Sequence, residues 1–327
     1  MSNINKRTIT QDEYFYGHKA CSGCGAALAV RIALKVLGER AISVLPAGCM
    51  SAVGFNFPQL AFKNNSIIST FAGTGSMLSG IYEGAKSLGI EDLQIVGFAG
   101  DGATADIGFQ TLSAAIDRGD DVIYICYDNE AYMNTGIQKS SLTPFGSSTT
   151  TTPAGKNIHG NTRNKKNIFD IIAAHDISYA ATASVGYIQD YIDKVEKASK
   201  IRGTKYIHVL SPCPVGWGTN TDDTIDLAKE IVDNCMFPLE EYENGKYSIK
   251  EIKNRKSVHD YIRKQRRYKH LTDEEIDLIE ENTIKNYENK LRRVYHDQKQ
   301  HQRNYKRKIR KFKNIKMLGR RIGNTKP

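Results

Sequence analysis

The chain has 327 residues, 40% of them hydrophobic and 25% charged, a composition typical of a globular protein long enough to bury a core. It contains no apolar run of about 18 residues and begins without the apolar stretch of a signal peptide, so we expect no membrane insertion and a cytoplasmic location. The formal net charge is +10, but residues 291–327 hold 14 Lys and Arg against one Asp, leaving 32 basic and 35 acidic side chains elsewhere. The excess positive charge therefore belongs to the tail.

Helix-like and strand-like patterns alternate along the first two thirds of the chain. The predicted helices cover residues 26–37, 80–88, 107–118 and 168–175, and the predicted strands cover residues 41–45, 93–99, 121–127 and 206–210. Continuous apolar strands separated by helices are typical of a mainly parallel sheet with helices on both faces. The sequence thus predicts an α/β domain over residues 1–220.

Two regions depart from this alternation. Residues 138–167 form a long stretch rich in Ser, Thr, Gly, Asn and Lys, whose composition fits a functional loop and solvated filler equally well. After Trp217 the pattern becomes helical and charged, with predicted helices at 222–237 and 273–293. We therefore expect a helical C-terminal arm over residues 221–290 and a partly disordered basic tail over residues 291–327.

Polar residues follow two neighbouring predicted strands. Gly100, Asp101 and Gly102 come after one strand, and Asn129 follows the next. A Gly-Asp-Gly sequence alone is better interpreted as a tight turn. Open α/β sheets bind ligands at the carboxyl ends of their strands, however, and carboxylate and amide oxygens suit Mg²⁺. The paired asparagine at this spacing is the pattern of thiamine-diphosphate enzymes, with the glycines letting the backbone approach the diphosphate.

Four cysteines lie in Gly- and Pro-rich connectors. Cys21 and Cys24 form a C-x₂-C turn, whereas Cys49 and Cys213 are isolated in PAGCMS and SPCP. Spacing alone leaves a Cys₄ zinc site and a [4Fe–4S] cluster nearly equal, and a thioredoxin-like redox pair is the weaker third option. Cys126, within a predicted strand, and Cys235 are better interpreted as core residues.

Four segments resemble the pyruvate:ferredoxin oxidoreductases, within the 2-oxoacid:ferredoxin oxidoreductase family. They are GHKACSGCGAALA (17–29), YDNEAYMNTGIQ (127–138), TPFGSSTTTTPAG (143–155) and SPCPVGW (211–217), and the similarity extends over about residues 12–290. The resemblance implies the thiamine-diphosphate-binding fold and the beta subunit of such an enzyme. This subunit would take part in oxidative decarboxylation of a 2-oxoacid to acyl-CoA and CO₂, passing electrons through a [4Fe–4S] cluster to ferredoxin.

The resemblance also implies roles for individual residues. The expected cofactor-binding residues are Gly100, Asp101, Gly102, Ala103, Asn129, Ala131, Asn134 and Thr135. Mg²⁺ would be bound by the side chains of Asp101 and Asn129 and by the carbonyl of Ala131. Asn134 would be catalytic, beside the thiazolium and the 2-oxoacid. The expected cluster ligands are Cys21, Cys24, Cys49 and Cys213.

The same resemblance implies that the chain works with partners. Thiamine enzymes need a glutamate against the aminopyrimidine, and neither Glu83 nor Glu130 lies in a matching context, so a partner subunit should supply it. We expect alpha-, gamma- and delta-type subunits, ferredoxin or flavodoxin, coenzyme A and a 2-oxoacid as partners, and no nucleic acid. The arm would pack on a partner subunit, although an ordinary peripheral helix pair fits its sequence equally well.

Three alternatives stay open at this point. Pyruvate is the commonest substrate of such enzymes, and a branched-chain 2-oxoacid is the nearest alternative. A nucleic-acid-binding protein with a Cys₄ zinc site and a basic tail would leave the pairing of Asp101 with Asn129 unexplained. A thiamine decarboxylase without redox chemistry would leave the four cysteines unexplained.

Overall fold

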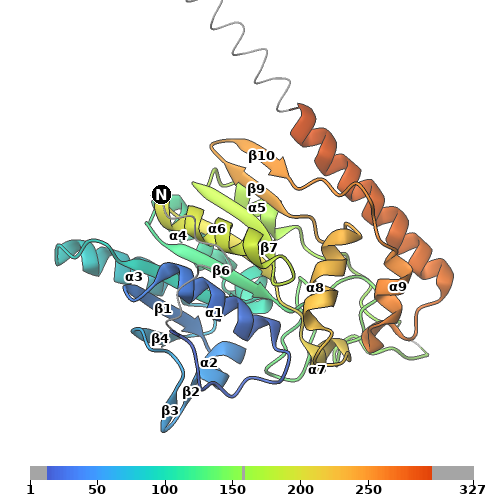
Figure 1. Cartoon of the computed structure of the whole chain (residues 1–327), viewed down its shortest axis with the longest axis horizontal. Helices are drawn as coiled ribbons and strands as arrows, with labels where there is room; N and C mark the ends of the chain where they lie inside the picture. The colour runs from blue at the N-terminus through green and yellow to red at the C-terminus, as the bar shows by residue number, and fades with distance from the viewer. Residues whose placement is uncertain (1–12, 157–158, 297–327) are drawn as a thin grey trace, which may run out of the picture.

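One eight-stranded sheet organises the chain, in a computed structural model that describes residues 13–156 and 159–296 (Figure 1). The strands lie in the order β10-β9-β7-β8-β6-β5-β1-β4. Their bounds are β1 Ala41–Pro46, β4 Ser66–Ser69, β5 Gln94–Gly100, β6 Ile123–Asp128, β7 Tyr179–Ser184, β8 Lys205–Leu210, β9 Glu240–Glu243 and β10 Lys246–Ile249. The strands from β7 to β4 are parallel, and β9 and β10 add an antiparallel edge. The mainly parallel sheet that the sequence predicted is confirmed.

Helices cover both faces of this sheet, because each strand directs alternate apolar side chains to opposite sides. Helices α1 (Gly25–Leu37) and α6 (Ile188–Lys200) pack on one face, where Ile125 and Val209 belong to their core. Helices α3 (Thr74–Ser87), α4 (Phe109–Arg118) and α5 (Ile168–Ala173) pack on the other, where Cys126 is fully buried. The interpretation of Cys126 as a core residue is thus confirmed.

A third core joins the C-terminal arm to the sheet. Its elements are α7 (Pro214–Trp217), α8 (Thr224–Asp233), α9 (Val258–Arg263), the 3₁₀ turn η2 (Arg266–Tyr268) and a long helix over residues 273–296. Trp217, Leu227, Tyr261 and Ile276 are all buried in this core. The start of the arm is therefore packed onto the α/β domain, and the far end of the long helix reaches β9 through ion pairs of Lys290 and Arg293 with Glu240 (Figure 1).

Several element boundaries differ from the predicted ones for local reasons. The predicted helix 107–118 is preceded by a π-helical turn, η1 (Ala103–Ile107), and Gly108 separates the two pieces. Helix α8 ends at Asp233 rather than residue 237, because Cys235 takes a positive φ of 68°. Strands β4, β7, β9 and β10 and helix α6 were not predicted. The long helix reaches residue 296, and the rest of the predicted basic tail lies outside the described residues.

Two small elements flank the carboxyl end of the sheet. Helix α2 (Cys49–Gly54) follows β1, and the hairpin of β2 (Phe55–Asn56) and β3 (Gln59–Leu60) projects beyond it (Figure 1). No helix in the described ranges is long and apolar enough to cross a membrane.

Candidate functional site

The candidate site is a cleft at the carboxyl ends of β5 and β6. The pairing of Gly100 with Tyr127 brings the two strand ends side by side, so that Asp101 and Asn129 lie in neighbouring connections. The cleft encloses about 40 Å³. Its lining contains every predicted cofactor residue, namely Gly100, Asp101, Gly102, Ala103, Asn129, Ala131, Asn134 and Thr135, together with Cys49. Residues that the sequence separates by up to 86 positions, from Cys49 to Thr135, are thus brought together.

Three oxygen atoms converge at the floor of this cleft. The side-chain oxygen of Asn129 lies 2.8 Å from the carbonyl oxygen of Ala131 and 3.0 Å from Oδ1 of Asp101. Rotating the Asn129 amide would let its nitrogen donate to both, and a cation between the oxygens would satisfy them without rotation. Octahedral Mg²⁺, with bonds of about 2.1 Å, places adjacent ligands about 3 Å apart. The spacing of the three oxygens therefore fits Mg²⁺.

Asp101 is held in a position to bind a cation, and its buried charge is uncompensated when no cation is bound. Its other oxygen, Oδ2, accepts a hydrogen bond of 2.5 Å from Ser140, which leaves Oδ1 facing Asn129. Burial, reinforced by the nearby carboxylate of Asp128, raises the pKa of Asp101 well above its usual range. A bound cation would compensate this buried charge.

Gly102 occupies a position with no space for a side chain. A Cβ atom there would lie 2.3 Å from the ring of Tyr132, whose hydroxyl donates to Asp106 at 2.8 Å. The glycine is therefore required by the packing of Tyr132 over the start of η1. The need for glycine at position 102 is therefore steric, in addition to the close approach of the backbone to the diphosphate that the sequence predicted.

The four predicted cluster cysteines lie in three segments, each at the start of a helix. Cys21 and Cys24 precede α1, Cys49 begins α2 and Cys213 precedes α7. Cys24 caps α1 and Cys213 caps α7, each accepting a backbone N–H through its sulfur. The first and last segments touch directly, since the Gly25 N–H donates to the Pro212 carbonyl at 3.1 Å. Burial raises the pKa of Cys49 to about 12, and the thiols of Cys213 and Cys24 add to this effect. The four thiols are therefore electrostatic neighbours.

The spacing of these sulfurs can be compared with what a single zinc ion requires. In the described part of the chain, no three of the four sulfurs lie mutually within 4.8 Å. A tetrahedral zinc ion with Zn–S bonds of about 2.3 Å would require about 3.8 Å between sulfurs. A cube of four irons and four sulfides is larger than one ion and separates its thiolates further. The four sulfurs are therefore not arranged around a single tetrahedral zinc ion.

A buried ionic network that the sequence did not predict lies directly behind the cleft. Lys165 contacts Asp128 at 2.6 Å and Glu130 at 2.7 Å. Arg267 contacts Glu130 at 2.6 Å, and His208 contacts Asp128 at 2.7 Å. Burial raises the pKa of Asp128, but Lys165 and His208 outweigh it and lower that pKa to about 2. One sequence feature could have predicted this network. Two acidic residues, at positions 128 and 130, alternate with Asn129 and Ala131 at the end of an apolar strand.

The two glutamates considered for the aminopyrimidine are both elsewhere. Glu130 is 2% exposed and faces Lys165 and Arg267, and Glu83 lies exposed on α3. Neither lines the cleft. The expectation that another chain supplies the catalytic glutamate therefore stands as a prediction.

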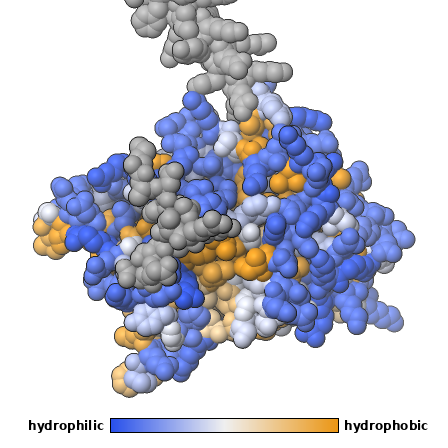
Figure 2. Space-filling model, viewed as in Figure 1, coloured by the Kyte–Doolittle hydropathy of each residue, from blue (hydrophilic) through white to orange (hydrophobic). Residues whose placement is uncertain are grey.

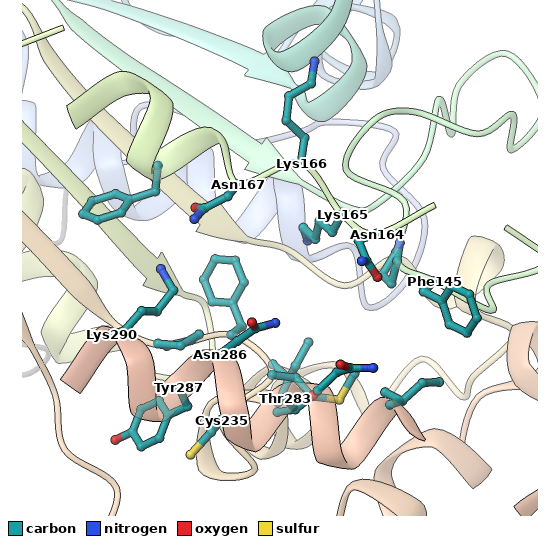
Figure 3. A pocket seen from close by; sticks show the side chains of 18 of the residues that line it. Phe145, Asn164, Lys165, Lys166, Asn167, Cys235, Thr283, Asn286, Tyr287 and Lys290 are labelled. Carbon is teal, nitrogen blue, oxygen red and sulfur yellow. The ribbon is translucent and has the colours of Figure 1, made fainter. Parts of the chain in front are cut away.

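A larger cavity of about 680 Å³ separates the sheet from the C-terminal helix (Figure 3). Asn286 and Lys290 project into it from the helix toward Asn167 on the opposite wall. Its five Lys and Arg side chains are all ion-paired within the chain; these are Lys165, Lys166, Arg267, Lys290 and Arg293. The cavity's charges are therefore already compensated. No sequence feature had predicted it.

Comparison with known proteins identifies the family. Residues 46–209 match the family model described as thiamine pyrophosphate enzyme, C-terminal TPP binding domain. Ketoisovalerate oxidoreductase subunit VorB of Pyrococcus horikoshii is 46% identical over 286 residues, covering 85% of this chain and 92% of that protein. Pyruvate synthase subunit PorB of Methanothermobacter thermautotrophicus is 44% identical over 275 residues, covering 84% and 96%.

The fold agrees with that assignment. A chain of 2-oxoglutarate:ferredoxin oxidoreductase from Magnetococcus marinus superposes with a TM-score of 0.53 at 19% identity, covering 70% of this chain and 81% of that one. The predicted thiamine-diphosphate-binding fold is thus confirmed, and the nucleic-acid alternative finds no support. The chain belongs to the 2-oxoacid:ferredoxin oxidoreductases, as their thiamine-diphosphate-binding beta subunit.

Proposed function

We propose that this chain holds the diphosphate end of thiamine diphosphate through Mg²⁺ and carries a [4Fe–4S] cluster beside it. With partner subunits it would convert pyruvate or a branched-chain 2-oxoacid, coenzyme A and oxidised ferredoxin to acyl-CoA, CO₂ and reduced ferredoxin. The observation that supports this most directly is the shared lining of the cleft. Cys49 lies in the same cleft as Asp101 and Asn129, so one residue links the two predicted cofactor sites.

The chain's own residues have separate tasks in this proposal. Asp101, Asn129 and the Ala131 carbonyl bind the cation, and Ser140 orients the Asp101 carboxylate. Bound thiamine diphosphate supplies the electron sink that decarboxylation of a 2-oxoacid needs. Asn134, exposed at the edge of the cleft, would orient the 2-oxoacid.

The cysteine sites suit an electron acceptor at this place. Burial raises the pKa of Cys24 and Cys213, and the N–H groups that they accept from the first turns of α1 and α7 partly offset this effect. Cys49 brings one ligand to the edge of the thiamine cleft, which keeps the electron path short. Ferredoxin or flavodoxin would receive the electrons through further clusters on partner chains.

Partner subunits are supported by the small cleft and by an uncovered apolar surface. About 40 Å³ is too small to enclose thiamine diphosphate, so most of its surface must be covered from outside this chain. Phe57 on the β2–β3 hairpin is 94% exposed and Leu60 is 66% exposed. Hydrophobic surface is visible where this hairpin projects at the lower edge of the molecule (Figure 2). An alpha-type subunit bearing the catalytic glutamate would bury this surface.

The identity of the 2-oxoacid is not decided by the relatives. The relatives include both a pyruvate synthase subunit and a ketoisovalerate oxidoreductase subunit, at 44% and 46% identity. Two percentage points do not discriminate between them. We propose pyruvate first and a branched-chain 2-oxoacid second, to be separated by the ratio of kcat/KM for the two substrates.

Anaerobic purification of the complex with its partner subunits tests the cofactors. We expect no zinc, and about four irons per beta chain in addition to the irons of the clusters on the partner chains. Cys24→Ser and Cys213→Ser should lose most of that iron, whereas Cys126→Ser should retain it because Cys126 is a core residue. Asp101→Ala should lose Mg²⁺-dependent thiamine diphosphate binding and keep the iron. Zinc in place of iron, or equal iron loss in all three cysteine variants, would contradict the assignment.

A further inference from the structure

The turn at residues 128–131 faces two environments at once. Asn129 and Ala131 direct their oxygens into the cleft, whereas Asp128 and Glu130 point into the ionic network behind it. Glu130 has a positive φ of 71°, in the left-handed region that side chains with a Cβ rarely adopt. Within the turn, the Glu130 N–H donates to Oδ1 of Asp128 at 2.9 Å, and residues outside the turn contact Glu130 as well.

We propose that Arg267, on the C-terminal arm, is the positioning residue that fixes this turn for cation binding. The inference rests on the proposed function, because it assumes that Asn129 and Ala131 bind Mg²⁺. Arg267 lies 138 residues after Asn129 and does not line the thiamine cleft. It would act through Glu130 and Trp217 only.

The first connection is the ion pair with Glu130. Arg267 is 6% exposed and Glu130 is 2% exposed, so their charges are shielded from water. Their closest atoms are 2.6 Å apart but not aligned as a hydrogen bond, so the attraction is mainly between charges. Thr143 fixes the same residue from the other side, donating to the Glu130 carbonyl at 2.7 Å. Glu130 is thus restrained at both its carboxylate and its backbone.

The second connection runs through Trp217. The Arg267 guanidinium stacks on the Trp217 ring at 4.0 Å from its centre, and Nε1 of that indole donates to the Asn129 carbonyl at 2.9 Å. Arg267 is itself oriented by Gln265, whose side chain accepts from its Nε at 2.9 Å. One guanidinium therefore supports two consecutive residues of the turn, and a lysine could reproduce its charge but not the planar stack.

Removing Arg267 should disturb the turn rather than only weaken the fold. Glu130 would keep Lys165 as a partner but lose the contact that directs it toward the arm. Trp217 would lose the planar guanidinium against which its ring packs, so its hydrogen bond would hold the Asn129 carbonyl less firmly. The Asn129 and Ala131 oxygens would then leave the spacing of about 3 Å that Mg²⁺ demands, while Ca²⁺ tolerates irregular ligand positions.

The test measures the Kd of thiamine diphosphate in Mg²⁺ and, separately, in Ca²⁺. The full-length chain is prepared with its partner subunits as wild type, Arg267→Met, Arg267→Lys and the matched control Arg266→Met, whose side chain is exposed on the same turn. We expect Arg267→Met to raise the Kd in Mg²⁺ at least tenfold, about 1.4 kcal/mol. The increase in Ca²⁺ should be several-fold smaller, and Arg266→Met should change neither value.

Arg267→Lys keeps the buried positive charge, so it tests geometry even if Arg267→Met fails to fold. It should shift the ratio of the two Kd values in the same direction as Arg267→Met, by less. Equal weakening in both metals, accompanied by a lower unfolding midpoint, would overturn the proposal in favour of purely structural support. Unchanged Kd values would also overturn it. A wild-type complex that binds no thiamine diphosphate with Mg²⁺ would instead refute the proposed function, before any variant is compared.

Discussion

Asp101→Asn should stabilise the cofactor-free chain while removing its cofactor binding. The Asp101 carboxylate is 1% exposed and lies near the negative charge of Asp128, with Ser140 as its hydrogen-bond donor. An amide of the same shape can still accept from Ser140. Its nitrogen can also donate to the Asn129 oxygen that Oδ1 of Asp101 now faces at 3.0 Å.

The magnitude follows from these two changes. A new buried hydrogen bond contributes about 1 kcal/mol, and relief of a buried, uncompensated charge contributes about 1 kcal/mol or more. We therefore expect the free energy of unfolding to rise by about 1–2 kcal/mol at pH 7 without Mg²⁺ and thiamine diphosphate. Urea denaturation of the full-length chain measures this difference, and calorimetry measures the accompanying loss of Mg²⁺-dependent thiamine diphosphate binding.

Asp106→Asn is the matched control for this substitution. Asp106 is half-buried near the same cleft but accepts hydrogen bonds from the Tyr132 hydroxyl at 2.8 Å and the Ser141 N–H at 3.1 Å. Removing its charge should therefore lower stability. If Asp101→Asn destabilises the chain as much as Asp106→Asn does, Asp101 is not electrostatically unsatisfied and the reasoning fails.

Three further substitutions test separate parts of the structure. Gly25→Ala should lower the iron content without removing a ligand, because its Cβ would lie 2.8 Å from the Pro212 backbone; Gly84→Ala, with open space, should leave the iron unchanged. Asp121→Asn should cost about 2 kcal/mol at neutral pH. Burial raises the pKa of Asp121, but its ion pairs with Lys205 and Arg202 have the larger effect and lower that pKa. The loss of stability in Asp121→Asn should therefore disappear as pH falls through the lowered pKa of Asp121. Urea denaturation at several pH values measures this loss. Phe57→Ser should weaken association with the partner subunits in analytical ultracentrifugation and leave the unfolding midpoint of the chain unchanged, because Phe57 is 94% exposed.

Much of the sheet was predictable because its central strands are continuous apolar runs. Strands β5 and β6 were predicted to within two residues, and with them the position of Asp101 and Asn129 at adjacent strand ends. Strand β7 was missed because its sequence, YAATAS, is small and weakly hydrophobic, although all six residues are buried. Burial of a strand on both faces depends on neighbours that local composition does not specify.

The network behind the cleft could not be predicted in the same way. Glu130 and Lys165 are 35 residues apart, and Arg267 is 102 residues beyond Lys165. Taken one at a time, each of these charged residues is typical of the protein surface. Only the tertiary fold, in which the long loop and the C-terminal arm meet behind β6, shows that these charges are paired and buried.

Trp217 gives the chain an intrinsic spectroscopic probe of its cofactor site. It is the single tryptophan among 327 residues, so all indole emission comes from one position. That indole is fully buried and hydrogen-bonded to the backbone of Asn129. In a cluster-free preparation its emission should start at short wavelength and change as Mg²⁺ and thiamine diphosphate fill the cleft, so cofactor binding can be followed without a label.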